Sequence, residues 1–116
     1  MRVLVLGTTG LLGSAVFHVL SEKKDWLVFG TLRTEEPKRF FAPGLIRNMV
    51  VCVDVLDQAE LIKLFNQTKP DVVINCISLA KPLLSAGSPL DIIPIYALLP
   101  HRLAHLCSLA GARLVH

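Results

Sequence analysis

After Met1 the chain reads Arg2-Val3-Leu4-Val5-Leu6-Gly7-Thr8-Thr9-Gly10-Leu11-Leu12-Gly13. Its first part, Arg2 to Leu6, is a short run of leucine and valine, which is typical of a strand. Three glycines then follow at intervals of three residues. From Leu12 the apolar residues recur at helical spacing as far as about Lys23. The stretch therefore predicts a strand, a tight turn and a helix, in that order.

Strand-like and helix-like segments alternate along the rest of the chain. Further strands are expected at Trp26 to Leu32, Met49 to Val53, Val72 to Cys76 and Arg113 to His116. Further helices are expected from Asp57 to about Gln67 and from about Leu90 to Leu109, whereas Thr34 to Asn48 and Ala80 to Pro89 are expected to be loops, the first with one turn around Phe40. Strands joined by helical crossovers pair in parallel. The fold class is therefore α/β, a Rossmann-type doubly wound parallel sheet with strand order 3-2-1-4-5.

Length and composition agree with this fold. The chain has 116 residues, of which 53% are hydrophobic and 18% charged. A chain of this length forms one domain, residues 1–116, and such apolar strands need helices on both faces of the sheet. Because the fifth strand is only beginning at His116, we expect the fold to be truncated after that strand. We expect the chain to be the N-terminal part of a larger protein.

Several classes of protein are not expected. The formal net charge is only +3, aromatic residues make up 6%, and the basic residues are scattered, which does not favour nucleic-acid binding. The apolar runs are too short to cross a membrane, and no export signal follows Met1, so a cytoplasmic location is expected. His101 and His105 are spaced as metal ligands often are, but no third ligand is evident, so no metal site is expected.

The glycines at positions 7, 10 and 13 carry the strongest chemical signal, because they lie between a strand and a helix. Gly7 permits the turn, Gly10 lets a phosphate group approach the backbone, and Gly13 lets the helix lie close to the strand. The start of the helix supplies free N–H groups and a partial positive charge. The turn therefore predicts a site for the pyrophosphate of a dinucleotide.

The spacing Gly-x-x-Gly-x-x-Gly resembles that of the extended short-chain dehydrogenases/reductases. The chain is most similar to the dTDP-4-dehydrorhamnose reductase family of sugar-nucleotide reductases. This resemblance also rests on four later motifs: Asp54-Val55-Leu56-Asp57, Val73-Ile74-Asn75-Cys76, Leu98-Leu99-Pro100-His101-Arg102-Leu103-Ala104 and Gly111-Ala112-Arg113-Leu114-Val115-His116. It implies an oxidoreductase that reduces a nucleotide-linked keto sugar, of which this chain is the cofactor-binding half. The family's Tyr-x-x-x-Lys would come after His116, so no catalytic residue is assigned here.

The end of the second predicted strand bears on the choice of cofactor. NAD-binding proteins usually carry an acidic residue there, whereas this chain has Thr31-Leu32-Arg33. A guanidinium at Arg33 suits the 2′-phosphate of NADP. NAD stays open, because Glu35 or Glu36 can turn back toward a ribose 2′-hydroxyl.

The predicted cofactor-binding set is Gly7, Thr9, Gly10, Leu11, Leu12, Gly13, Arg33, Asp54, Val55, Ile77 and Ser78. The resemblance implies that Asp54 accepts from the adenine amino group and that the backbone of Val55 frames the ring. It places Ile77 and Ser78 against the ribose and the nicotinamide side. Asp57 is interpreted as the cap of the following helix, in a capping box with Glu60, and not as part of the site.

Two further functions stay open beside the reductase. One is a non-catalytic, cofactor-binding regulatory subunit; the other is a nucleotide-sugar epimerase or dehydratase. Tyr96 stands where the family has an asparagine that orders the active site, which weakens the case for full catalytic competence. The expected partners are a nicotinamide dinucleotide, a nucleotide sugar bound by the missing part, and further copies that associate through the open edge of the sheet.

Overall fold

The computed structural model describes residues 1–51, 54–77 and 98–115. The strands are β1 (Arg2–Leu6), β2 (Leu27–Leu32), β3 (Met49–Val51), β4 (Val72–Asn75) and β5 (Arg113–Val115). The helices are α1 (Leu11–Ser21), the 3-10 helix η1 (Glu36–Phe40), α2 (Pro43–Ile46), α3 (Gln58–Thr68) and α6 (Leu99–Ala110). Within these residues, no helix is long and apolar enough to cross a membrane.

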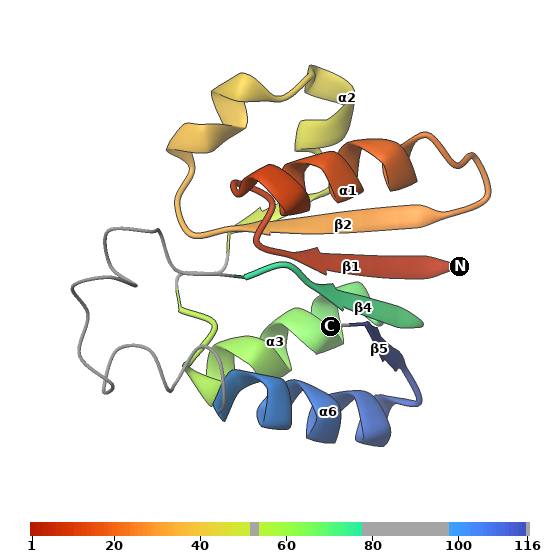
Figure 1. The fold of residues 1–116 in the computed structure, drawn as a ribbon, viewed down its shortest axis with the longest axis vertical. Coiled ribbons are helices and arrows are strands. Elements are labelled where there is room, and N and C mark those ends of the chain that lie inside the picture. The colour runs from red at the N-terminus through yellow and green to blue at the C-terminus, as the bar shows by residue number, and fades with distance from the viewer. Residues whose placement is uncertain (52–53, 78–97, 116) are drawn as a thin grey trace.

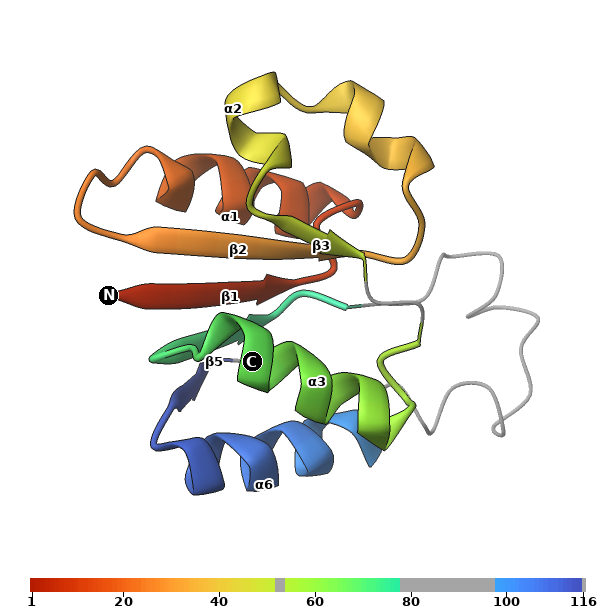
Figure 2. The same cartoon turned by 180° about the vertical axis from the view of Figure 1, so that it is seen from behind.

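The strands form one sheet in the order β3-β2-β1-β4-β5. All the pairings are parallel, and Val3 of β1 is opposite Val28 on one side and Val72 on the other. Helices α1 and α2 lie on one side of the sheet and α3 and α6 on the other (Figures 1 and 2). The predicted doubly wound sheet and its strand order are therefore confirmed.

The central strand β1 is buried on both faces. Leu4 and Leu6 pack with residues of α3 and α6, whereas Val3 and Val5 pack on the side of Phe17 in α1. Successive side chains of a strand point to opposite faces, so a strand between two layers of helices needs apolar residues at every position. This explains why the first strand has no alternation of apolar and polar residues.

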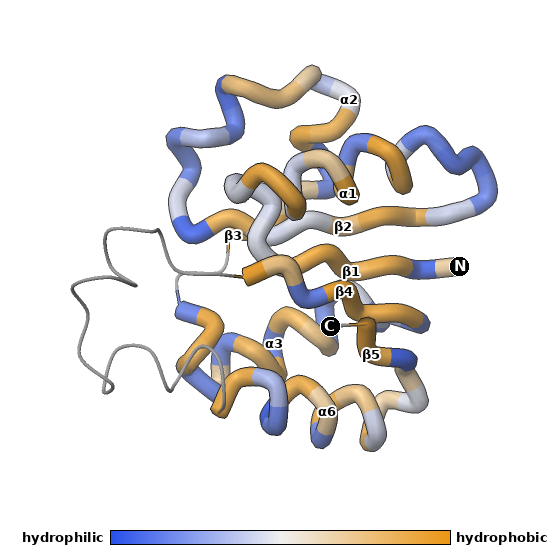
Figure 3. Tube along the Cα trace, viewed as in Figure 1, coloured by the Kyte–Doolittle hydropathy of each residue, from blue (hydrophilic) through white to orange (hydrophobic). Residues whose placement is uncertain are grey.

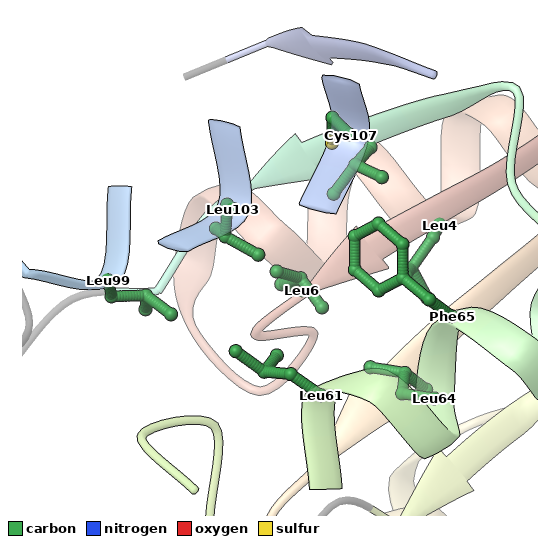
Figure 4. Packing of buried hydrophobic residues seen from close by; sticks show 9 residues of the cluster. Leu4, Leu6, Leu61, Leu64, Phe65, Leu99, Leu103 and Cys107 are labelled. Carbon is green, nitrogen blue, oxygen red and sulfur yellow. The ribbon is translucent and has the colours of Figure 1, made fainter. Parts of the chain in front are cut away.

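Each face of the sheet has its own hydrophobic cluster. The cluster under α3 and α6, shown in Figure 4, comprises Leu4, Leu6, Leu61, Leu64, Phe65, Val73, Leu99, Leu103 and Cys107. The cluster under α1 comprises Val3, Val5, Phe17, Val28, Leu32, Phe41 and Met49. Hydrophobic residues follow the strands, and hydrophilic residues gather in the connection from α1 to β2 and in the segment after β2 (Figure 3).

The structure differs from the expectations mainly between residues 34 and 48. The turn around Phe40 is present as η1, but Pro43–Ile46 form an additional short helix, α2, that the sequence analysis did not predict. Helix α1 begins at Leu11 and ends at Ser21, slightly earlier than expected. Residues 52–53, the expected loop after β4 and the first part of the last helix lie outside the described residues.

Candidate dinucleotide site

The turn between β1 and α1 requires glycine at its first position. Gly7 has a φ of 81°, in the left-handed region. A Cβ atom added there would also lie 3.1 Å from the carbonyl oxygen of Cys76 and 3.1 Å from the Cα of Ile77. The backbone of β1 therefore turns directly against the end of β4, and only a residue without a side chain fits easily.

Gly13 is required by the contact between α1 and this turn. A Cβ atom at Gly13 would lie 1.9 Å from the carbonyl oxygen of Gly7 and 3.2 Å from the Cβ of Cys76. Helix α1 thus sits on the turn itself, as the sequence analysis predicted for the last glycine. The fold alone accounts for Gly7 and Gly13.

Gly10 is not required by the fold. It is the N-cap residue of α1, with φ −75° and ψ 166°, a backbone conformation open to any residue. A Cβ atom at Gly10 would meet nothing closer than the carbonyl oxygen of Gly7, at 4.0 Å. Because glycine has no side chain, no side-chain oxygen caps the first N–H groups of α1. Open space at position 10 therefore lies beside backbone N–H groups of α1 that no side chain caps.

The residues around Gly10 face outward. Thr9 is exposed, and Leu11 and Leu12 have exposed fractions of 94% and 66%. The first two side chains of α1 are therefore apolar and exposed. Thr8, in contrast, is fully buried.

Thr31 fastens the turn to the end of β2. The amide of Gly7 donates to the Thr31 hydroxyl oxygen at 3.1 Å. The amide and the hydroxyl of Thr8 both donate to the Thr31 carbonyl, at 3.1 and 2.8 Å. This role of Thr31 was not predicted from the sequence. The bonds place the turn beside the residues that follow β2, including Arg33.

Arg33 is exposed and follows directly on β2. The neighbouring acidic residues are engaged elsewhere: Glu35 pairs with Lys38 at 2.9 Å, and Glu36 pairs with Arg39 at 3.4 Å. Among the described residues, Arg33 forms no ion pair of its own. The positive charge at this strand end is therefore available to a ligand.

A cleft of about 400 Å³ opens between the glycine-rich turn and η1. Its lining residues are Thr8, Thr9, Ser14, His18, Pro37, Phe40 and Phe41. His18 stacks on Phe41 with ring centroids 5.3 Å apart, and its Nδ1 bonds the Ser14 carbonyl at 2.8 Å. Another hollow, of about 290 Å³, lies between β3 and α3 and contains none of the predicted site residues.

Asp54 lies in a tight turn after β3. Its carboxylate accepts from the Leu56 amide at 2.9 Å, and its carbonyl accepts from the Asp57 amide at 3.1 Å. The Asp57 carboxylate accepts from the amides of Ala59 and Glu60, at 2.9 and 3.4 Å. The predicted helix cap at Asp57 is therefore confirmed. The capping box is not the observed arrangement, because the Asp57 amide donates to Asp54.

Arg102, from the first turn of α6, reaches this same segment. Its Nη1 donates to the carbonyl oxygen of Leu56. In the sequence Arg102 stands only within a family motif, and nothing in that motif indicates which residue lies opposite it. Helix α6 is thus tied directly to the turn that holds Asp54.

The end of β4 lies against the glycine-rich turn. The Asn75 side chain accepts from the Ile77 amide at 3.1 Å, and Ile77 is half-buried against Gly7. Burial raises the pKa of the Cys76 thiol. Ser78 lies outside the described residues.

The carboxyl ends of parallel strands meet at one edge of the sheet, which is where open α/β sheets bind ligands. The structure joins the β1 turn directly to the ends of β2 and β4, and it places Asp54 and Val55 after β3. His101 and His105 are exposed on α6. Nowhere in the described part do His, Cys, Asp and Glu side chains gather in a group of three that could hold a metal ion.

Comparison with known proteins identifies relatives of this arrangement. The chain is 29% identical over 115 residues to methionine adenosyltransferase 2 subunit beta of Xenopus laevis, covering 99% of this chain and 31% of that protein. It therefore spans about a third of the length of this curated relative.

Similar solved structures include UDP-glucose 4-epimerase of Thermus thermophilus in complex with NAD (TM-score 0.78, 23% identity, 98% of this chain and 36% of that one). Another is dTDP-4-dehydrorhamnose reductase of Clostridium acetobutylicum (TM-score 0.71, 24% identity, 98% and 34%). A third is L-threonine dehydrogenase of Phytophthora infestans (TM-score 0.76, 21% identity, 98% and 34%). At these identities the structures establish the fold.

A model of one protein family matches residues 3–116, nearly the whole chain, including the glycine-rich turn and the ends of all the strands. The chain belongs to the NAD dependent epimerase/dehydratase family.

Proposed function

We propose that the chain binds the pyrophosphate of a nicotinamide dinucleotide against the turn between β1 and α1. The main support for this proposal is that a glycine stands at position 10 although the fold does not require one there. The fold explains Gly7 and Gly13, but the backbone and the open space at Gly10 would accept a side chain. A glycine there serves a ligand that must come close to the N–H groups of α1.

We propose further that the dinucleotide is NADP. Arg33 is exposed at the end of β2, and the nearby Glu35 and Glu36 pair with Lys38 and Arg39. Those carboxylates are therefore engaged, whereas the Arg33 guanidinium is available to a 2′-phosphate. The other proposed contacts are those of Asp54 and Val55 with the adenine ring. Ile77 and Ser78 are proposed to contact the ribose and the nicotinamide side.

For the intact protein we propose the reduction of a nucleotide-linked keto sugar. The family membership and the motifs shared with the sugar-nucleotide reductases support this assignment. The nicotinamide would supply hydride, while this chain's residues bind and orient the dinucleotide. An epimerase or dehydratase of the same family would regenerate its dinucleotide, so net consumption of NADPH separates these reactions from a reductase.

A second candidate is a cofactor-binding subunit of another enzyme. It is favoured by the 29% identity to a protein named as subunit beta of methionine adenosyltransferase 2, and by Tyr96 in place of the family's asparagine. Under this proposal the intact protein would bind NADPH without turnover and would associate with a methionine adenosyltransferase catalytic chain. Co-purification with that chain, in the absence of keto-sugar reduction, would favour the subunit.

The first test is a titration of the intact protein with NADPH and NADH. We expect NADPH to bind more tightly, and we expect Arg33→Ala to remove about 1.5–3 kcal/mol of binding free energy for NADPH alone, as expected for hydrogen bonds to a charged group. Gly10→Val should weaken both dinucleotides alike, because it blocks the approach of the pyrophosphate.

Arg47→Ala is the matched control, since Arg47 is also exposed but lies after α2. It should leave both affinities unchanged. Equal affinities of the unmodified protein for NADPH and NADH would contradict the NADP assignment. Unchanged binding in Gly10→Val would contradict the pyrophosphate site.

A further inference from the structure

The turn after β3 is held by a side-chain and a backbone hydrogen bond. The Leu56 amide donates to Asp54 Oδ1, and the Asp57 amide closes the turn on the Asp54 carbonyl. The side chains of Val55 and Leu56 are half-buried and pack against the cluster under α3 and α6. Within the described residues, the second carboxylate oxygen of Asp54 takes part in no hydrogen bond, so it can accept from a ligand.

Arg102 supplies the remaining constraint on this turn. It lies 46 positions away in the sequence, on α6, and its half-buried guanidinium donates to the carbonyl oxygen of Leu56. In the part of the chain that the structure describes, Arg102 forms no ion pair with a carboxylate. Its described hydrogen bond is thus to the backbone of the turn, and no neighbouring acidic residue accounts for its presence there.

We infer that Arg102 is a positioning residue for recognition of the adenine ring. The Leu56 carbonyl belongs to the peptide whose N–H, that of Asp57, donates to the Asp54 backbone carbonyl, so the bond from Arg102 holds the turn closed. The closed turn keeps the Leu56 amide against Asp54 Oδ1, and this sets the direction of the Asp54 carboxylate. Arg102 itself need not touch the ligand. The inference rests on the proposed function, because it takes Asp54 as the acceptor of the adenine amino group.

The chemistry of Asp54 makes this inference specific. An ionised carboxylate only accepts hydrogen bonds, so it suits the amino group of adenine and not the carbonyl group of hypoxanthine. If Arg102 sets the direction of the carboxylate, removing it should reduce the discrimination between these bases. A loss of folded protein would reduce the binding of both dinucleotides equally and leave the ratio of their dissociation constants unchanged.

The experiment compares NADPH with its deamino analogue, which carries hypoxanthine in place of adenine, by titration of the intact protein. For the unmodified protein we expect NADPH to bind about tenfold or more tightly, as for a hydrogen bond to a charged group. Arg102→Ala should bring the ratio of the two dissociation constants close to one. Arg102→Lys should restore most of it, because lysine retains a donor that can reach the Leu56 carbonyl.

His105→Ala, at an exposed position one turn further along α6, is the control and should keep the full ratio. An unchanged ratio in Arg102→Ala, with the unmodified protein discriminating as expected, would overturn the role of Arg102 and leave the cofactor site intact. If the unmodified protein binds both dinucleotides equally, the assignment of Asp54 fails and the inference fails with it. If it binds neither, the proposed function is wrong.

Discussion

At Gly13 a methyl group would lie 1.9 Å from the backbone carbonyl oxygen of Gly7, so backbone and not a flexible side chain would have to move. Overpacking typically costs about 1–3 kcal/mol, and we expect Gly13→Ala to cost about 3 kcal/mol or more of unfolding free energy. The measurement is urea denaturation.

Gly44 provides the matched control for this prediction. A Cβ atom there would meet nothing within 4 Å. Gly44→Ala should therefore leave the stability unchanged or raise it by up to about 1 kcal/mol, as glycine replacements do at unstrained positions. Equal stability of the two alanine variants would show that α1 does not rest on Gly7 as described.

Individual residues differ in how far the sequence could predict their roles. Gly7 and Gly13 belong to a local motif, and Asp57 is recognisable as a cap because its partners lie two and three residues ahead. Thr31 and Arg102 bond partners 24 and 46 positions away. Such contacts exist only once the sheet and α6 have assembled, so no local spacing could have indicated them.

Helix α3 depends on its cap at Asp57, whose carboxylate accepts from two amides of the first turn. Asp57→Ala should reduce the unfolding free energy by about 1 kcal/mol, the usual effect of removing such a cap. Asp57→Ser should retain most of the stability, because serine also caps well. Because Asp57 is not among the proposed site residues, neither variant should change the affinity for NADPH. A tenfold loss of affinity in Asp57→Ala would place Asp57 in the site.

The strands, α1 and α3 followed from the sequence, and one turn was expected around Phe40 where η1 lies, whereas α2 was not predicted. The β-branched and leucine runs and the helical spacings predicted β1, β2, α1 and α3 to within a few residues. The segment 34–48 contains η1 and α2, each of at most five residues. A helix as short as α2 has too little periodicity to be recognised, and Phe41 and Met49 on either side of it pack against the α1 side of the sheet.

Across the whole molecule, β1 joins the two hydrophobic clusters, because its alternate residues belong to opposite faces. If β1 separates from either cluster, the apolar residues of the other cluster are exposed as well. We therefore expect the described sheet and its helices to unfold in one cooperative transition. Trp26, the only tryptophan of the chain, packs against the α1 cluster and reports on that face alone.

This coupling can be tested from the opposite face. Leu103 of α6 is fully buried in the other cluster, and Leu103→Ala should cost about 2–5 kcal/mol. Because β1 is shared, the urea midpoint seen by Trp26 fluorescence should fall as far as that seen by circular dichroism. Leu109→Ala lies on the same helix, but 72% of this residue is exposed. It should change the unfolding free energy measured by either probe by less than about 0.5 kcal/mol. A Trp26 transition that stayed in place while the circular dichroism transition moved would show that the two faces unfold independently.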